Sequence, residues 1–163
     1  FVRRRCLVPV DGWYEWTRTD SGGRQAFFIT GTPDAPLGGG GVLALAGLWS
    51  VWGTGEERRL TFSVVTTGAV GRLREVHDRM PLVLPAARWA PWLACGEGDG
   101  ESGTEPDESL LVPPSVDLLD ALELRPVGPA VGDVRNDGPH LTDQMAPDSA
   151  GSSRSQAGNF MLF

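Results

Sequence analysis

Apolar and polar residues alternate along the first part of the chain, as they do in strands that bury one face. RCLVPVDGWYEWTR, which starts at Arg5, is rich in β-forming residues and carries a turn or bulge signal at Asp11-Gly12. It predicts two short strands or one bent strand. The polar turn TDSGGR follows, and RQAFFITG, from Arg24, predicts the next strand.

The middle of the chain predicts further strands. VLALAGLWSVW, from Val42 to Trp52, is apolar on both alternating faces and predicts a central strand covered on both sides. LTFSVVTT predicts another strand, and RMPLVLP an extended segment. GTPDAPLGGGG predicts a loop; no Lys-Ser or Lys-Thr follows its four glycines, so a hairpin loop is favoured over a phosphate cradle.

Helical spacing is limited to short segments. AVGRLREVHD predicts a short helix with Val70, Leu73 and either Val76 or His77 on one face. PAARWAPWLAC predicts a helix that starts at Pro85, and PSVDLLDALEL a short helix before a last strand or extended segment in RPVGPAVGDV. These elements predict an α+β fold with a mostly antiparallel, barrel-like sheet and short flanking helices.

The length of 163 residues and the hydrophobic content of 40% predict one globular domain, over residues 1–143. An acidic, glycine-rich stretch at about residues 96–109 predicts a mobile loop insertion, and residues 144–163 have the composition of a disordered tail. The chain starts at Phe1 and runs directly into a strand-like segment, so we interpret it as a C-terminal portion that has lost upstream sequence.

Charge divides the chain into two parts. Residues 1–92 hold 11 Arg against 8 Asp and Glu, whereas residues 93–163 hold 3 Arg against 13, and the chain has no lysine. The total of −7 argues against strong nonspecific binding to duplex DNA, although a local basic groove is compatible with it. No long apolar run and no signal-peptide pattern is visible, which predicts a cytoplasmic protein.

Only a few residues are candidates for chemistry. Cys6 and Cys95 fit neither a disulfide framework nor a zinc pattern, so packing is favoured over a Cys/His hydrolase that would pair either with His77. No cluster predicts a metal or a cofactor. His140 lies in a turn near the tail, where a solvated histidine is the ordinary outcome.

Two acid–base candidates stand in more informative places. His77, in EVHDRMP, lies at a helix-to-strand junction, where sites are often built, although the pattern alone favours a histidine that interacts with the last helix carbonyls. Glu15 lies between Tyr14 and Trp16 on a predicted strand and therefore points to the face opposite both aromatic rings. The pattern alone favours exposure for Glu15; in a cleft its pKa would rise and it would exchange protons.

Five blocks, in this order, resemble the SRAP (SOS response-associated peptidase) family: RRRCLVPVDGWYEW, LALAGLWSVW, TFSVVTT, HDRMPLVLP and VRNDGP. The resemblance covers approximately Phe1 to Thr142, and Trp13 replaces a phenylalanine that is common in the first block. It implies a monomer that binds single-stranded DNA at abasic sites in the DNA damage response, near the nucleoid. It also implies self-processing peptidase activity, which removes the initiator methionine.

The resemblance implies a crosslinking reaction. An N-terminal cysteine joins the ring-opened aldehyde of an abasic site, and its amine and thiol close a stable thiazolidine. By matching motif, Glu15 and His77 would be catalytic. Residues that would contact DNA, also by matching motif, are Arg79, Trp16, Thr66 and Thr67.

The family's N-terminal cysteine and upstream asparagine motif match no position here, because Cys6 and Asn136 already have their own family counterparts. We therefore expect this polypeptide alone not to crosslink abasic DNA. Two alternatives remain: a non-catalytic module that binds single-stranded DNA, and an inactive remnant with exposed apolar strand surface.

Overall fold

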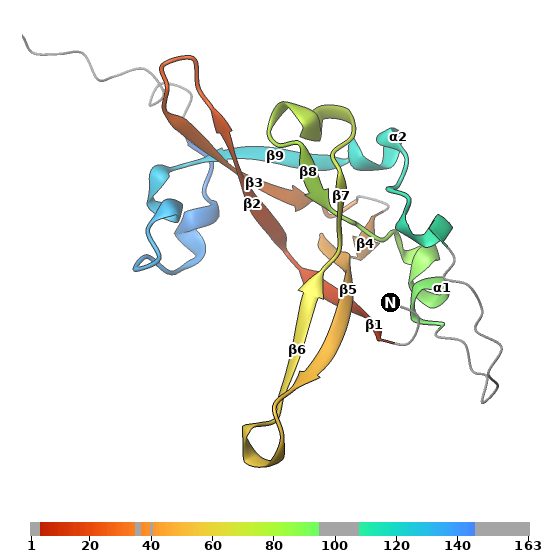
Figure 1. The fold of residues 1–163 in the computed structure, drawn as a ribbon. Coiled ribbons are helices and arrows are strands. Elements are labelled where there is room, and N and C mark those ends of the chain that lie inside the picture. Colours follow the sequence, from red (N-terminus) through yellow and green to blue (C-terminus); the bar gives the residue numbers. More distant parts are fainter. Residues whose placement is uncertain (1–3, 35–36, 40, 95–107, 146–163) are drawn as a thin grey trace, which may run out of the picture.

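Strands dominate the fold and form three antiparallel sheets in the computed structural model, which describes residues 4–34, 37–39, 41–94 and 108–145 (Figure 1). In the first sheet, β5 (Val42–Trp52) pairs with β1 (Arg5–Val10), β4 (Gly38–Gly39) and β6 (Arg59–Val64). The second sheet has the order β2 (Gly12–Arg18), β3 (Arg24–Gly31) and β9 (Leu122–Val127). The third pairs β7 (Thr66–Gly68) with β8 (Arg79–Pro81).

Helical segments are short. The α-helices are α1 (Trp89–Leu93) and α2 (Val116–Leu119). The 3-10 helices are η1 (Gly55–Glu57), η2 (Gly71–Glu75), η3 (Ala86–Arg88), η4 (Glu108–Leu111), η5 (Pro129–Gly132) and η6 (Pro139–Thr142). The predicted α+β class with mostly antiparallel strands is confirmed, and the sheets of the described residues do not close into a barrel. No helix in these residues is long and apolar enough to cross a membrane.

The first predicted strand region divides into two strands that belong to different sheets. The break is at Asp11, whose carbonyl accepts a hydrogen bond of 2.6 Å from the Thr30 hydroxyl. Gly12 is required there, because a Cβ at this position would lie 2.4 Å from the carbonyl oxygen of Ile29. The close backbone approach lets β2 leave the first sheet and start the second.

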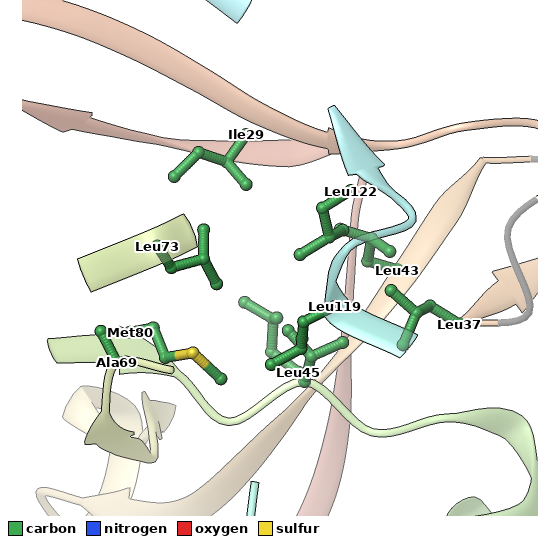
Figure 2. Packing of buried hydrophobic residues seen from close by; sticks show 10 residues of the cluster. Ile29, Leu37, Leu43, Leu45, Ala69, Leu73, Met80, Leu119 and Leu122 are labelled. Carbon is green, nitrogen blue, oxygen red and sulfur yellow. The ribbon is translucent and has the colours of Figure 1, made fainter. Parts of the chain in front are cut away.

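The main core lies between the sheets and the short helices. Side chains from β3, β5, η2, β8, α2 and β9 meet there (Figure 2): Ile29, Leu43, Leu45, Leu73, Met80, Leu119 and Leu122. A second cluster surrounds Trp92 of α1, which is fully buried and donates its indole N–H to the Cys6 carbonyl at 2.9 Å. These two clusters fix η2 and α1 against the strands.

The β5–β6 hairpin projects away from the rest of the molecule (Figure 1). Leu43–Ala46 of β5 are buried, but Trp52 is 65% exposed, and Leu60 and Phe62 of β6 are 74% and 62% exposed. The prediction that all of Val42–Trp52 is covered on both sides is therefore wrong for the end of the strand, where Ser50 and Trp52 are exposed, whereas Leu48 still packs against the cluster around Trp92.

One face of this hairpin carries Trp49, Leu60 and Phe62. Trp49 is paired with Phe62, and Leu60 precedes Phe62 by two residues on β6, so all three side chains point to the same side. We call these three residues the β5–β6 apolar face. Together with Cys6 and Val8 they line a pocket of about 410 Å³.

The helix predictions need correction at their boundaries. The segment after Ala69 forms the five-residue 3-10 helix η2, which buries Leu73, and Val76 just beyond it is also buried, whereas His77 is exposed. The helix predicted in PSVDLLDALEL stops at Leu119, and the last strand starts at Leu122, three residues before the predicted segment. Pairing of β9 with β3 overrides the local helical spacing there.

The predicted domain ends at residue 143, but the chain is still hydrogen-bonded to β9 two residues later, where Met145 donates its backbone N–H to the Pro126 carbonyl at 2.9 Å. The rest of the predicted tail, most of the acidic insertion and Cys95 lie outside the described residues. The last two residues of the predicted insertion, Glu108 and Ser109, belong to η4.

Candidate active site

The two faces of β2 have different surroundings, as the alternation predicts. Trp13 and Glu15 lie on one face, opposite Ile29 and Phe27 of β3, and Trp13 and Phe27 pack against the main core. Tyr14 and Trp16 lie on the other face and pack against a separate small cluster around Phe28 (ring centroids of Tyr14 and Phe28 5.1 Å apart). Glu15 is half-buried rather than fully exposed.

The turn between η2 and β8 holds His77 beside the Glu15 face of β2. The Thr17 hydroxyl of β2 donates to the Glu75 carbonyl at 3.3 Å, which ties the strand to η2. The His77 backbone N–H donates to the Leu73 carbonyl at 3.1 Å, and Leu73 is itself a core residue. His77 is thus positioned by a buried anchor four residues earlier, while its own side chain is exposed.

The electrostatics of Glu15 reflect both its burial and its neighbour. Burial raises the pKa of the Glu15 carboxyl above its ordinary value, and the positive charge of the His77 imidazolium partly offsets that rise. A raised pKa keeps a larger fraction of the carboxyl protonated near neutral pH, as a proton donor requires.

The imidazole of His77 has a backbone partner for each of its protonation states. The Arg79 backbone N–H lies 3.0 Å from Nδ1, and the Arg79 carbonyl oxygen lies 3.1 Å from the same atom. Nδ1 accepts from the N–H when it is unprotonated and donates to the carbonyl when it is protonated. Both of these contacts involve Nδ1 and neither involves Nε2.

Arg79 is held at the edge of the same region by Thr66. Its Nε donates to the Thr66 hydroxyl at 3.1 Å, and one terminal nitrogen donates to the Thr66 carbonyl at 2.8 Å. The guanidinium is exposed, so its remaining N–H groups face solvent with a fixed orientation. Thr67 is partly buried and lies opposite Met80 in the register, so its side chain points to the other face of β7.

Four of the predicted site residues are therefore joined by successive interactions: Glu15, His77, Arg79 and Thr66. The structure does not bring Trp16 to them, because Trp16 lies on the opposite face of β2. Within the described ranges, no group of three or more His, Cys, Asp or Glu side chains could hold a metal ion.

Cys6 is unsuited to act as a nucleophile. It is half-buried on β1 and lines the pocket beside the β5–β6 apolar face. Burial raises the pKa of its thiol, which lowers the thiolate fraction that nucleophilic attack requires. This agrees with the packing role predicted for it.

The sequence matches the family described as "SOS response associated peptidase (SRAP)" over residues 1–134, which is most of the chain. The chain belongs to the SRAP family. The resemblance predicted from the five sequence blocks is confirmed.

Several relatives of this SRAP chain carry the name abasic site processing protein. The YoqW protein of Bacillus subtilis (strain 168) is 31% identical over 145 residues, covering 87% of this chain and 58% of the relative. The YedK protein of Escherichia coli (strain K12) is 31% identical over 137 residues, covering 84% and 56%. The HMCES protein of Rattus norvegicus is 28% identical over 178 residues, covering 93% and 48%. This SRAP chain spans about half the length of these relatives.

Sequence reasoning about the SRAP chain missed one feature of its surface. A pocket of about 540 Å³ lies on the Trp16 face, between the β2–β3 hairpin and the segment around β9 and η5. The hairpin itself was predictable from the turn TDSGGR between two strand patterns. The closing wall of the pocket was not, because Val127, Gly132 and Met145 lie about a hundred residues later in the chain.

Proposed function

We propose that this chain binds single-stranded DNA at an abasic site and transfers protons while the abasic aldehyde is captured. The substrate class is taken from the names of its SRAP relatives. The observation that carries the proposal is the half-buried Glu15 carboxyl, with its raised pKa, facing His77 at the junction of η2 and β8. An exposed arginine, held by Thr66, lies next to His77.

Capture of an abasic site needs acid–base assistance at two steps, opening of the sugar ring and loss of water. The sugar is a cyclic hemiacetal, and opening it moves a proton from the hydroxyl to the ring oxygen. The aldehyde then condenses with an amine, and the departing hydroxyl takes a proton and leaves as water. Addition of a neighbouring thiol to the imine carbon, with transfer of the thiol proton to the imine nitrogen, closes the thiazolidine.

Glu15 and His77 have complementary properties for these steps. The Glu15 carboxyl, in its protonated form, donates to the oxygen that departs, and burial favours that form by raising its pKa. Nε2 of His77 accepts or donates the second proton, since Nδ1 has a backbone partner in either state. Arg79 contacts a phosphate oxygen with the N–H groups that Thr66 does not occupy.

The nucleophile that the family resemblance implies matches no position in this sequence, so the test supplies it from outside. Free L-cysteine, a 1,2-aminothiol, is mixed with abasic single-stranded DNA, and thiazolidine formation is followed by mass spectrometry. We expect the chain to accelerate the reaction by about 10-fold or more, since positioned acid–base groups typically contribute ~10²–10⁴-fold. Glu15→Gln and His77→Asn should each remove most of this acceleration.

The matched control is Glu75→Gln, which changes an exposed carboxylate on η2 in the same chemical way. It should react like the wild type. Wild-type rates for both Glu15→Gln and His77→Asn would contradict the proposal. A crosslink between the chain itself and abasic DNA that survives denaturing electrophoresis would instead contradict the expectation that this polypeptide alone lacks the nucleophile.

A non-catalytic DNA-binding module is a second candidate, which the exposed and oriented guanidinium of Arg79 favours. It predicts salt-dependent binding to single-stranded DNA with no acceleration of the cysteine reaction.

A further inference from the structure

Two arginines face each other at the turn end of the β2–β3 hairpin. This turn lies at the upper left of Figure 1. Arg18 and Arg24 are directly opposite in the register, and both are exposed. Like charges directly across an antiparallel pair are destabilising. Among the described residues neither arginine forms an ion pair or a side-chain hydrogen bond, and Asp20, in the turn between them, is bonded to neither.

These arginines share a face of the hairpin with Trp16. Side chains at Trp16, Arg18 and Arg24 point to the same side, because Trp16 precedes Arg18 by two residues and Arg24 is its cross-strand partner. Trp16 and Arg24 both line the pocket of about 540 Å³, and the hydroxyl residues Thr19 and Ser21 line it as well. The pocket therefore combines an aromatic ring, hydroxyl groups and the guanidinium of Arg24. Arg18 does not line the pocket itself but lies directly across the hairpin from Arg24.

This combination fits one unit of a single-stranded nucleic acid. A base stacks on an aromatic ring whatever its identity, and a phosphate is bound between two guanidinium groups. An anion placed between Arg18 and Arg24 would also relieve the repulsion within the hairpin.

The position of β2 connects this pocket with the candidate active site. In the order β2-β3-β9, β2 is an edge strand, with β3 as its pairing partner in the sheet. A strand of DNA can pass around that free edge, from the face that carries Glu15 to the face that carries Trp16. Glu15 and Trp16 are consecutive residues, so only one step along β2 separates the candidate active site from this pocket.

We propose that this pocket binds a nucleotide that flanks the abasic site, with its base on Trp16 and its phosphate between Arg18 and Arg24. The inference rests on the proposed function, since it extends the same DNA strand from the Glu15 face. It also explains why a residue expected to contact DNA lies on the side of β2 away from Glu15.

The test measures binding of the chain to fluorescently labelled, undamaged oligodeoxythymidylate by anisotropy over a series of salt concentrations. The double variant Arg18→Gln/Arg24→Gln should bind about 10-fold more weakly, and its salt dependence should flatten by about 0.7 for each lost phosphate contact. Trp16→Leu should also weaken binding by about 10-fold while leaving the salt dependence unchanged. The matched control is Arg58→Gln, which changes an exposed arginine between η1 and β6, and it should bind like the wild type.

Thermal melting separates lost contacts from lost folding. The double arginine variant should melt at the same temperature as the wild type or higher, because it removes a like-charge pair. A lower melting temperature together with weaker binding would contradict the inference, because the loss would then reflect folding. Weaker binding with an unchanged salt dependence would also contradict it.

The binding results distinguish the two proposals. If the wild type does not bind the oligonucleotide at all, the proposed function fails for this chain and the inference fails with it. If the wild type binds and the double arginine variant binds equally well, only the flanking-nucleotide pocket is excluded.

Discussion

At the scale of single residues, the same local pattern placed two neighbours in different environments. Glu15 and Trp16 are consecutive on β2, yet one faces the η2–β8 turn and the other a mixed polar pocket. Glu15 is half-buried opposite Phe27 of β3, and Thr17, on the same face of β2, is hydrogen-bonded to η2. Its raised pKa follows from this burial, which the charge of His77 partly offsets.

The raised pKa of Glu15 makes a prediction for stability. In the folded state the carboxyl binds its proton more tightly than in the unfolded chain. The stability that this group contributes is thus fully present below the unfolded pKa and is lost as the pH rises through the folded pKa. At about pH 3.5, Glu15→Gln should have the same melting temperature as the wild type. Near pH 7 its melting temperature should be higher than that of the wild type.

Circular dichroism melts at several pH values check this. Glu75→Gln should follow the wild type at every pH, because that side chain is exposed. A difference between Glu15→Gln and the wild type that does not change with pH would contradict the assignment of the raised pKa to Glu15. If Glu15→Gln is more stable than the wild type at neutral pH but catalyses the cysteine reaction more slowly, it shows the trade-off between stability and activity that is common at active sites.

At the scale of elements, arginine forks hold the short helices in place. Arg5 donates to the carbonyls of Trp92 and Ala94 at the end of α1, and Arg125 donates to the Thr142 carbonyl of η6 at 3.0 Å. Arg88 donates to the carbonyls of Ser109, Leu110 and Val112, at 2.9, 2.9 and 2.6 Å. Helices of four or five residues have little stability of their own, so these bonds and a few buried side chains position them.

Arg88 also joins the two sides of the acidic stretch, since it lies before residue 95 and its acceptors lie after residue 107. Arg88→Ala removes the guanidinium donor from three carbonyls and should destabilise the protein by about 1–3 kcal/mol. Arg72→Ala, at an exposed position of η2, should change the free energy of unfolding by less than about 0.5 kcal/mol. Urea denaturation measures both, and equal midpoints for the two variants would show that Arg88 does not hold η4.

At the scale of the whole molecule, apolar surface is distributed unevenly. The β5–β6 apolar face lies exposed on a projecting hairpin, whereas the main core is closed by β3, η2, α2 and β9. An exposed apolar strand surface of this kind favours association with other apolar surfaces. We therefore expect the β5–β6 apolar face to promote association of this chain with itself.

The double variant Leu60→Thr/Phe62→Thr should reduce the binding of an apolar dye and slow aggregation at high protein concentration. Threonine keeps the β-propensity of these strand positions, and both side chains are largely exposed, so the free energy of unfolding should change by less than about 1 kcal/mol. Val134→Thr is the control, because Val134 is 100% exposed but isolated from this face. Dye binding and aggregation that are unchanged in the double variant would exclude this face as their origin.

Much of the fold was predictable where the pattern was local. The strands Arg24–Gly31 and Val42–Trp52 have the predicted bounds, because strong two-residue alternation or continuous apolar sequence marks them. The strand Leu122–Val127 was partly mistaken for helix, because its leucine spacing suits both structures until β3 is available as a partner. The exposure of Leu60 and Phe62 could not be predicted, since it depends on what packs against the hairpin.

The sequence by itself determined which residues alternate along β2, and so that Glu15 and Trp16 lie on opposite faces; it also carried the SRAP blocks that mark the family. Only the tertiary structure decided that Glu15 is half-buried beside His77, that Thr66 orients Arg79, and that the Trp16 face forms a pocket. The physical reason is that side-chain direction follows from backbone period within a strand. Burial, pKa and pocket shape depend instead on segments that are remote in the chain and meet only on folding.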